Sequence, residues 1–136
     1  MIIFNKAKEI SYLSDYKREH IGCIAVYKNH ILAVGYNTNK THPLQQKYNK
    51  YRKMKYEGTE PAASLHAEMS CLMQIKDMDI DFNKVELYVY RENKNGIIAI
   101  SRPCAACMKM IDKLGIKKIH YTTDGGFADE IRKEVS

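Results

Sequence analysis

Two short motifs, far apart in the chain, constrain the fold more than any other feature of the sequence. The first is His66-Ala67-Glu68 and the second is Pro103-Cys104-Ala105-Ala106-Cys107. Together they offer one imidazole and two thiols that can bind a single metal ion, and a carboxylate two residues from the imidazole. Three protein ligands leave one position of a tetrahedral Zn²⁺ open, and an open position distinguishes a catalytic zinc from a structural one. We therefore expect a fold that brings both motifs to one site.

Each motif alone supports other interpretations. A lone C-x-x-C pair is more often half of a structural zinc site or a redox pair. A structural site would need a fourth ligand, and neither Cys23 nor Cys71 has a pairing spacing. Both lie in apolar runs, so we expect them to be small core residues. A thioredoxin-like pair would follow the first strand near the N-terminus, which is not where Cys104 and Cys107 lie. The combination favours one Zn²⁺ held by His66, Cys104 and Cys107.

The size of the chain fits one domain with its own core. It has 136 residues, of which 45% are apolar, and we expect a single domain over residues 1–136. No apolar run is long enough to cross a bilayer, so no membrane association is expected. The N-terminal apolar patch precedes the first charge, which is the wrong order for a secretory signal. We therefore expect a cytoplasmic protein with reduced cysteines.

The positive charge is concentrated in one segment. The net charge is +6, and residues 40–56 hold six Lys and Arg side chains and no acid, so the remainder sums to zero. Tyr48, Tyr51 and Tyr56 are interleaved with these cations, a mixture that tracks phosphates and stacks bases in nucleic-acid-binding proteins. The alternative, which we favour, is a solvated helix whose Leu44, Tyr48 and Tyr51 face packs inward or on another subunit.

Hydrophobic spacing predicts alternating helices and strands. Helices are expected over residues 6–19, 65–76, 104–114 and 128–135, and part of residues 37–61 is also expected to be helical. Strands are expected over residues 21–27, 31–36, 85–90 and 116–121. The first two strands should form a hairpin, and the third should fold back through Asn95-Gly96 to residues 97–100.

Local signals place the ends of two helices. Ser64 is a candidate N-cap for the helix expected over residues 65–76. Pro103 is a candidate first residue for the helix expected over residues 104–114, and Gly115 should end that helix. A strand, a crossover helix and a parallel strand in succession indicate an α/β fold. Both motifs open crossover helices, where ligand sites of such sheets lie. The helix dipoles would also favour thiolate at Cys104 and Cys107.

On these residues, the chain resembles the cytidine deaminase-like superfamily, whose zinc-dependent members carry H-x-E and P-C-x-x-C. The resemblance covers roughly residues 17–123 and includes the strand at 21–26, Gly35-Tyr36-Asn37, both motifs and the strand entry at 115–119. The layout is most similar to deoxycytidylate-type deaminases, including small ones of phage type. The resemblance implies a three-layer α/β/α sandwich with a central mixed sheet, often in a homo-oligomer.

The resemblance also implies a reaction, the hydrolytic deamination of a nucleobase. Zn²⁺ lowers the pKa of water that it binds to about 7, which makes hydroxide available at neutral pH. Glu68 would be the proton shuttle and not a ligand. By the same resemblance, Asn37 would contact the sugar or base, and the backbone N–H of Ala67 would help to read the base.

The sequence leaves the substrate open. A free nucleoside or nucleotide, such as cytidine or dCMP, is the favoured small-molecule substrate, and Arg102 is then either a phosphate contact or a surface charge. His42 either lines the pocket mouth or forms a turn. The alternatives are a base within single-stranded DNA or tRNA, bound through the basic segment, and a non-catalytic module stabilised by zinc.

Three departures limit the resemblance. Residues 92–100 lengthen the link between the third strand and Pro103. Arg102 stands where tRNA adenosine deaminases have glutamate. The chain stops at Ser136, which leaves little room for a fifth core strand.

Overall fold

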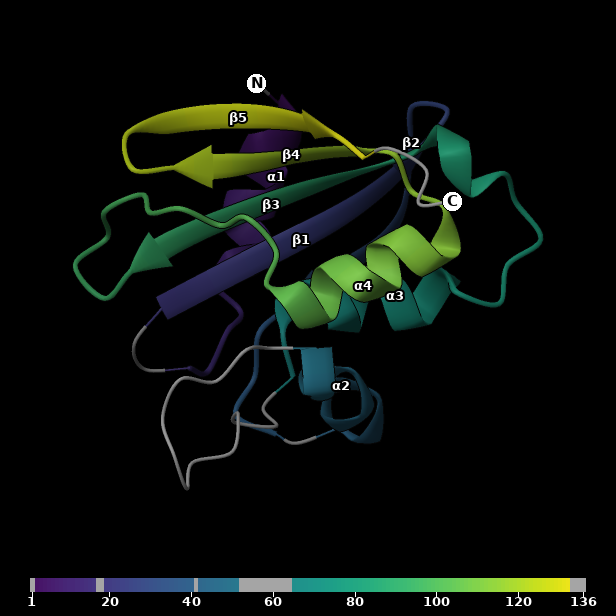
Figure 1. Ribbon diagram of the computed structural model, residues 1–136. Coiled ribbons are helices and arrows are strands. Elements are labelled where there is room, and N and C mark those ends of the chain that lie inside the picture. Colours follow the sequence, from purple (N-terminus) through teal and green to yellow (C-terminus); the bar gives the residue numbers. More distant parts are fainter. Residues whose placement is uncertain (1, 17–18, 41, 52–64, 133–136) are drawn as a thin grey trace.

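The protein folds around one mixed sheet of five strands in the order β2-β1-β3-β4-β5 (Figure 1). The computed structural model describes all residues except 1, 17–18, 41, 52–64 and 133–136. The strands are β1 (Glu19–Tyr27), β2 (His30–Tyr36), β3 (Val85–Asn93), β4 (Lys118–Thr123) and β5 (Gly126–Ile131). Only β3 and β4 are parallel, and the other neighbouring pairs are antiparallel.

Helices cover both faces of the sheet, and this confirms the three-layer α/β/α sandwich. The helix α1 (Ile2–Ser11) lies on one face, and α3 (Ala67–Ile75) and α4 (Ala105–Leu114) lie on the other. β1 is buried on both faces, because Cys23 and Ala25 belong to the larger core with α3 and α4, whereas Ile24 and Val26 belong to a smaller core with α1. A continuous apolar run of this kind is typical of a strand covered on both sides.

The hairpin between β1 and β2 and the crossover from β3 to β4 confirm two predictions. Lys28 and Asn29 connect β1 to β2 with φ angles of 49° and 69°, which a two-residue hairpin turn requires. α4 connects the parallel strands β3 and β4, and Gly115 ends it in the left-handed conformation with φ of 91°. The chain folds back on β3 as expected, but the pairing is short and consists of a single bridge between Glu92 and Ile98.

The C-terminal prediction was wrong. Residues 126–131 form β5 beside β4, where we expected a helix over 128–135 and little room for a fifth strand, and residues 133–135 of that expected helix lie outside the described residues. Tertiary contacts override the local pattern here: the Phe127 ring lies 4.5 Å from that of Phe4, and Glu130 pairs with Arg102. The exposed and half-buried residues alternate along β5, as in a half-covered edge strand.

The N-terminal helix was misplaced. α1 ends at Ser11, whose hydroxyl donates to the carbonyl of Lys8 at 2.6 Å, and Glu19 begins β1 instead of ending a helix. Tyr12 and Leu13, which we expected inside the helix, are 54% and 59% exposed in the turn that follows. The apolar periodicity continued beyond the helix that it predicted.

The helix starts at both motifs fall slightly later than expected. α3 begins at Ala67 and not at Leu65, and Ser64 lies outside the described residues. α4 begins at Ala105 with Cys104 as its N-cap, so Pro103 precedes the helix. The segment before α3 is partly helical as predicted, with α2 (Pro43–Tyr48) and a single 3₁₀ turn, η1 (Asn49–Tyr51). A second 3₁₀ turn, η2 (Phe82–Lys84), precedes β3.

Gly35 lets α3 lie directly on β2. A Cβ atom at this position would lie 2.5 Å from the carbonyl oxygen of Ala67 and 2.6 Å from the amide nitrogen of Cys71. Both neighbours are backbone atoms, so a side chain here must displace the helix. The start of α3 carries the first motif, and the position of that motif therefore depends on this glycine.

We predict that Gly35→Ala lowers the free energy of unfolding by about 1–3 kcal/mol, because overpacking of this kind costs that much in well-packed cores. Urea denaturation measures the change. Gly126→Ala is the matched control, because its Cβ would meet no atom closer than 3.6 Å. Equal stability of the two variants would contradict the close packing of α3 on β2.

Candidate metal centre and active site

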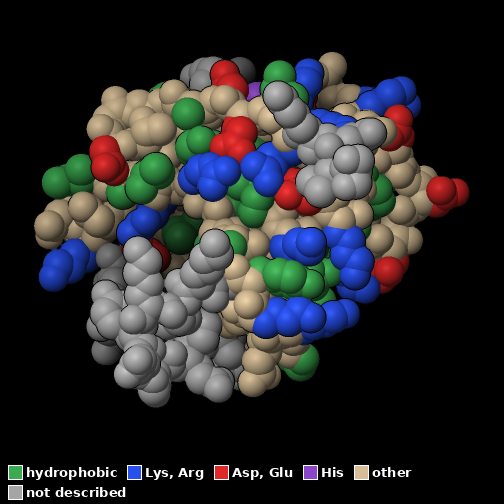
Figure 2. Space-filling model, in the orientation of Figure 1, with side chains coloured by type: hydrophobic (Ala, Val, Ile, Leu, Met, Phe, Trp, Pro, Cys, Tyr) green, Lys and Arg blue, Asp and Glu red, His purple; other side chains and the backbone are tan. Residues whose placement is uncertain are grey.

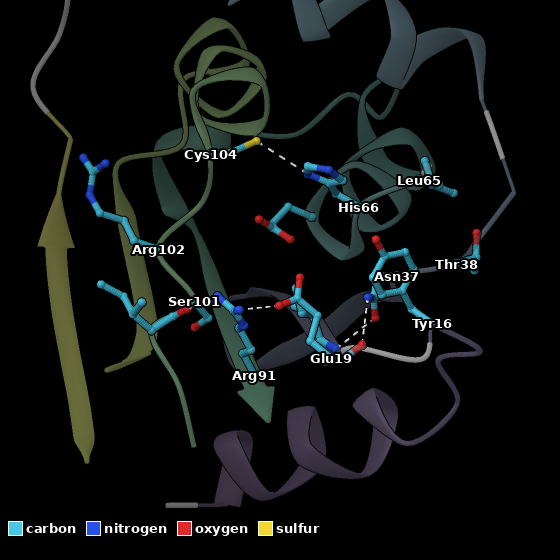
Figure 3. Close-up of a pocket in the computed structure, with 13 residues that line it drawn as sticks. Tyr16, Glu19, Asn37, Thr38, Leu65, His66, Arg91, Ser101, Arg102 and Cys104 are labelled. Atoms are coloured by element: carbon cyan, nitrogen blue, oxygen red, sulfur yellow. Dashed lines mark hydrogen bonds and ion pairs between the residues drawn. The ribbon is translucent and has the colours of Figure 1, made fainter. Parts of the chain in front are cut away.

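The structure brings the imidazole and the two thiols of the motifs together. Nδ1 of His66 lies 3.5 Å from Sγ of Cys104, a contact drawn in Figure 3, and 3.5 Å from Sγ of Cys107. The three donor atoms lie within 4.8 Å of one another, and within the described part of the chain this is the one group of its kind. The predicted convergence of the two motifs is therefore present in the fold.

The local structure of both helices explains this meeting. His66 is the N-cap of α3 and Cys104 is the N-cap of α4, and neither side chain caps its own helix. An N-cap side chain ordinarily accepts a backbone N–H of the first turn. Here the side chains of His66 and Cys104 contact each other instead of capping their helices. The thiol of Cys107, three residues after Cys104, lies on the same side of α4.

The donor set and its spacing fit zinc. A tetrahedral Zn²⁺ with Zn–S of about 2.3 Å and Zn–N of about 2.0 Å separates sulphur from nitrogen by roughly 3.5 Å. The two sulphur–nitrogen separations in the protein are both 3.5 Å. Two thiols and one imidazole are also the donors that zinc prefers over harder cations. His66, Cys104 and Cys107 would therefore hold the ion and leave one position open.

The two thiols are electrostatically unequal. A hydrogen bond from the Cys107 thiol, assisted by His66, lowers the pKa of Cys104 to about 3. The same bond and complete burial raise the pKa of Cys107 well above its usual value. The pair thus shares one proton, and a cation bound between the sulphurs would take the place of that proton.

Gln45 of α2 fixes the backbone at the first motif. Its side chain is completely buried, and its Oε1 accepts the backbone N–H of His66 at 3.1 Å. Its Nε2 donates to Oδ1 of Asn49 at 2.8 Å, so the amide is held at both ends. Nothing in the sequence marks this residue, because a glutamine in a polar segment gives no sign of burial.

Glu68 lies in the first turn of α3, only 5% exposed. Burial raises the pKa of its carboxyl to about 7, and Cys104 contributes in the same direction while His66 opposes it. Its Oε1 is buried and has no hydrogen-bond partner among the residues that the structure describes. A carboxyl group that exchanges a proton near neutral pH is suited to general acid–base chemistry.

The two motifs open into a cavity of about 260 Å³ (Figure 3). Five of its lining residues were singled out from the sequence: Asn37, His66, Glu68, Arg102 and Cys104. The others are Tyr16, Glu19, Ile21, Thr38, Leu65, Arg91, Ile100 and Ser101. Among these, the charged pair Glu19 and Arg91 was missed, because no motif marks either residue.

The candidate substrate contacts differ in where they lie. The side chain of Asn37 lines the cavity, but its Oδ1 accepts the N–H of Ile21 at 2.9 Å and its Nδ2 donates to the Glu19 carbonyl at 3.2 Å. Ala67 is fully buried at the start of α3 and is not among the cavity-lining residues. Roles for both in substrate binding stay predictions.

Arg102 and His42 each make a structural contact of the kind that the sequence offered as an alternative, and their roles in substrate binding stay predictions. Nε and Nη2 of Arg102 donate to the Glu130 carboxylate at 2.8 and 3.0 Å, which makes a bidentate pair at the edge of the sheet. Nδ1 of His42 accepts the N–H of Leu44 at 3.0 Å and so caps α2. His42 lines a different cavity, beside Met73, and not the one that contains the motifs.

The described part of the basic segment packs against α4. Lys47 and Lys113 lie over the Tyr48 ring, and Lys50 and Lys109 lie over the Tyr51 ring. Figure 2 shows Lys and Arg side chains gathered around apolar surface over α2 and α4. Tyr48 is only 6% exposed, which agrees with the inward packing that we favoured, and Tyr51 is 38% exposed. Residues 52–56 of the segment lie outside the described residues.

Comparison with known proteins agrees with this architecture. The sequence pattern of the family described as "Cytidine and deoxycytidylate deaminase zinc-binding region" matches residues 2–123. An α/β/α sandwich with three candidate metal donors and a buried glutamate at two helix starts fits a zinc-dependent deaminase fold. The chain belongs to this cytidine and deoxycytidylate deaminase family. No curated protein sequence matches the chain significantly.

Solved structures give the same fold. The dCMP deaminase of cyanophage S-TIM5, in complex with dCMP and dUMP, is 26% identical, with a TM-score of 0.60 over 88% of this chain and 77% of that chain. The apo form of the same deaminase gives a TM-score of 0.57 over 87% of this chain and 77% of that chain. A cytidine deaminase from Burkholderia pseudomallei is 15% identical, with a TM-score of 0.60 over 96% and 90%, and shows the fold alone. No described helix has the length and apolar character to cross a membrane.

We predict that Gln45→Ala weakens zinc affinity by about 10–100-fold, the usual cost of losing a group that orients a ligand. Competition with a chromophoric chelator measures the affinity. The control is Gln46→Ala, because Gln46 is the same residue type, adjacent and exposed. A folded Gln45→Ala variant that binds zinc as tightly as the wild type would contradict the positioning role of Gln45.

Proposed function

We propose that this chain is a zinc-dependent hydrolytic deaminase that replaces the exocyclic amine of a nucleobase with an oxo group and releases ammonia. Cytosine in a free nucleoside or nucleotide is the proposed substrate. The observation that carries the proposal is the buried Glu68 carboxyl, with one unpartnered oxygen, in the same small cavity as His66 and Cys104. Family membership and the similarity to a dCMP deaminase bound to dCMP and dUMP support it.

The chemistry divides between the metal and Glu68. A zinc ion held by His66, Cys104 and Cys107 would supply the Lewis acid that makes water nucleophilic at neutral pH. Glu68 takes the proton of the attacking water and passes it to the ring nitrogen. A carbon–oxygen bond forms at the amine-bearing carbon, Glu68 then takes the remaining proton of the added hydroxyl and gives it to the departing amine, and the carbon–nitrogen bond breaks to release ammonia. Burial keeps this carboxyl able to hold and release protons near neutral pH.

The cavity favours a small substrate. Its volume of about 260 Å³ is just below the roughly 300–1,000 Å³ that is usual for small-molecule sites. A base within a polynucleotide is the alternative, and the lysines around Tyr51 favour it. Lys50 and Lys109 already lie over the Tyr51 ring, and Tyr48 is buried, so neither of these two rings offers an open stacking platform.

We also propose that the protein acts in the cytoplasm as a homo-oligomer. Phe127 and Ile131 on the edge strand β5 are 50% and 73% exposed and give a second copy an apolar surface to cover.

We predict that Glu68→Gln retains zinc but lowers the rate of ammonia release by at least about 10²-fold, because general acid–base catalysis by one side chain is worth about 10²–10⁴-fold. Zinc content by mass spectrometry and ammonia release are measured on the same sample. A variant that keeps full turnover would overturn the role of Glu68. The non-catalytic module would show zinc binding and no turnover in either protein.

A product screen tests the substrate class. Zinc-loaded protein is incubated with cytidine, dCMP, dCTP, adenosine, guanine, single-stranded DNA and tRNA. We expect ammonia from free cytosine compounds. Ammonia from single-stranded DNA or tRNA alone would replace the small-molecule proposal with the polynucleotide alternative.

A further inference from the structure

An ion pair forms the cavity wall across from the metal donors. Glu19 begins β1, and Arg91 lies near the end of the antiparallel strand β3. The Arg91 guanidinium pairs with the Glu19 carboxylate and donates through Nη1 to the carbonyl of Ile100 at 2.9 Å. Both side chains line the cavity that holds His66 and Glu68, and Figure 3 shows the pair below the metal donors.

Both arginines that line the cavity in the described part of the chain are already paired with a carboxylate. Arg91 faces Glu19, and Arg102 makes its bidentate pair with Glu130. That pair holds the pKa of Glu130 near 2. No lysine is among the lining residues in the described part of the chain. A phosphate dianion in this cavity would find each described arginine already paired with a carboxylate and would meet the like charge of Glu19, and like charges placed side by side are unfavourable.

The cavity instead presents groups that suit an uncharged ligand. Among the described residues, buried side-chain atoms that lack a hydrogen-bond partner include Oγ1 of Thr38, Oε1 of Glu68 and Nε of Arg91, and all three residues line the cavity. An ionised carboxylate only accepts hydrogen bonds, and it accepts them strongly from hydroxyl groups. Glu19 is therefore suited to hold the hydroxyls of a sugar.

The surroundings of Glu19 fix its position. Arg91 orients its carboxylate, and Asn37 binds its backbone carbonyl at 3.2 Å while accepting the N–H of Ile21. Asn37, which the family resemblance assigned to substrate contact, is thus also a positioning residue for the segment that carries Glu19.

We propose that Glu19 is the specificity-determining residue of the site, accepting sugar hydroxyls and excluding phosphate, so that the substrate is an uncharged nucleoside and not a nucleotide. The proposal rests on the deaminase function proposed above and narrows its substrate class. Arg91 is a positioning residue, because it acts through the Glu19 carboxylate.

The test compares cytidine with CMP, which share base and sugar and differ only in the phosphate. Wild-type protein should show a kcat/KM for cytidine at least about tenfold above that for CMP, the effect of a contact worth about 1.4 kcal/mol. Glu19→Gln should raise KM for cytidine about tenfold with little change in kcat, and should reduce the preference over CMP. Arg91→Gln should reduce the same preference.

A matched control separates specificity from stability. Glu9→Gln makes the same chemical change on the exposed surface of α1 and should alter neither substrate. A wild-type preference for CMP would overturn the proposal. Equal losses for cytidine and CMP in Glu19→Gln would also overturn it, because a merely structural role lowers both alike.

Binding keeps the proposal testable if the deaminase function fails. Absence of ammonia from every compound would reject that function. Calorimetric titration of zinc-loaded protein with the products uridine and UMP would then decide the inference. We expect wild-type protein to bind uridine more tightly than UMP. The Glu19→Gln variant should bind the two compounds with more similar affinities. Tighter binding of UMP, or binding of neither, would overturn it.

Discussion

The packing of α3 and α4 against the sheet brings two helix starts together, and the candidate site depends on this contact. His66 and Cys104 both occupy N-cap positions and meet at 3.5 Å instead of capping their own helices. The sheet makes this meeting possible, because α3 lies on β2 and β1 while α4 connects the parallel strands β3 and β4. Gly35 allows the first of these contacts, and Gln45 fixes the backbone of His66. The candidate metal site is therefore a consequence of how α3 and α4 pack against the sheet.

The elements that the sequence predicted are those with local signals. β1 is a continuous apolar run, α4 ends at a left-handed glycine, and both motifs carry their chemistry in the residue types themselves. The strand β5 was missed because what holds it is distant in sequence, namely β4, Phe4 and Arg102. The end of α1 was missed because apolar residues at helical spacing continue into an exposed turn.

The same distinction applies to the site. The metal donors and Glu68 could be named from spacing, whereas Glu19 and Arg91 come together only through the antiparallel pairing of β1 and β3. The missed strand had a direct consequence for Arg102. Its partner Glu130 lies on β5. Because we expected a helix in place of β5, the sequence offered Arg102 no partner, and a phosphate contact was one of its two predicted roles. His42 was ambiguous for a similar reason, because a cap and a pocket residue look alike until the cavity is located.

We infer that His66, Cys104 and Cys107 hold one zinc ion and leave one of its positions open. X-ray absorption at the zinc edge of the loaded protein measures the number and type of the ligands. We expect two sulphurs at about 2.3 Å, one imidazole nitrogen at about 2.0 Å and one further light atom that exchanges with solvent. Three or four sulphurs, or two imidazoles, would mean a closed structural site and would contradict this inference.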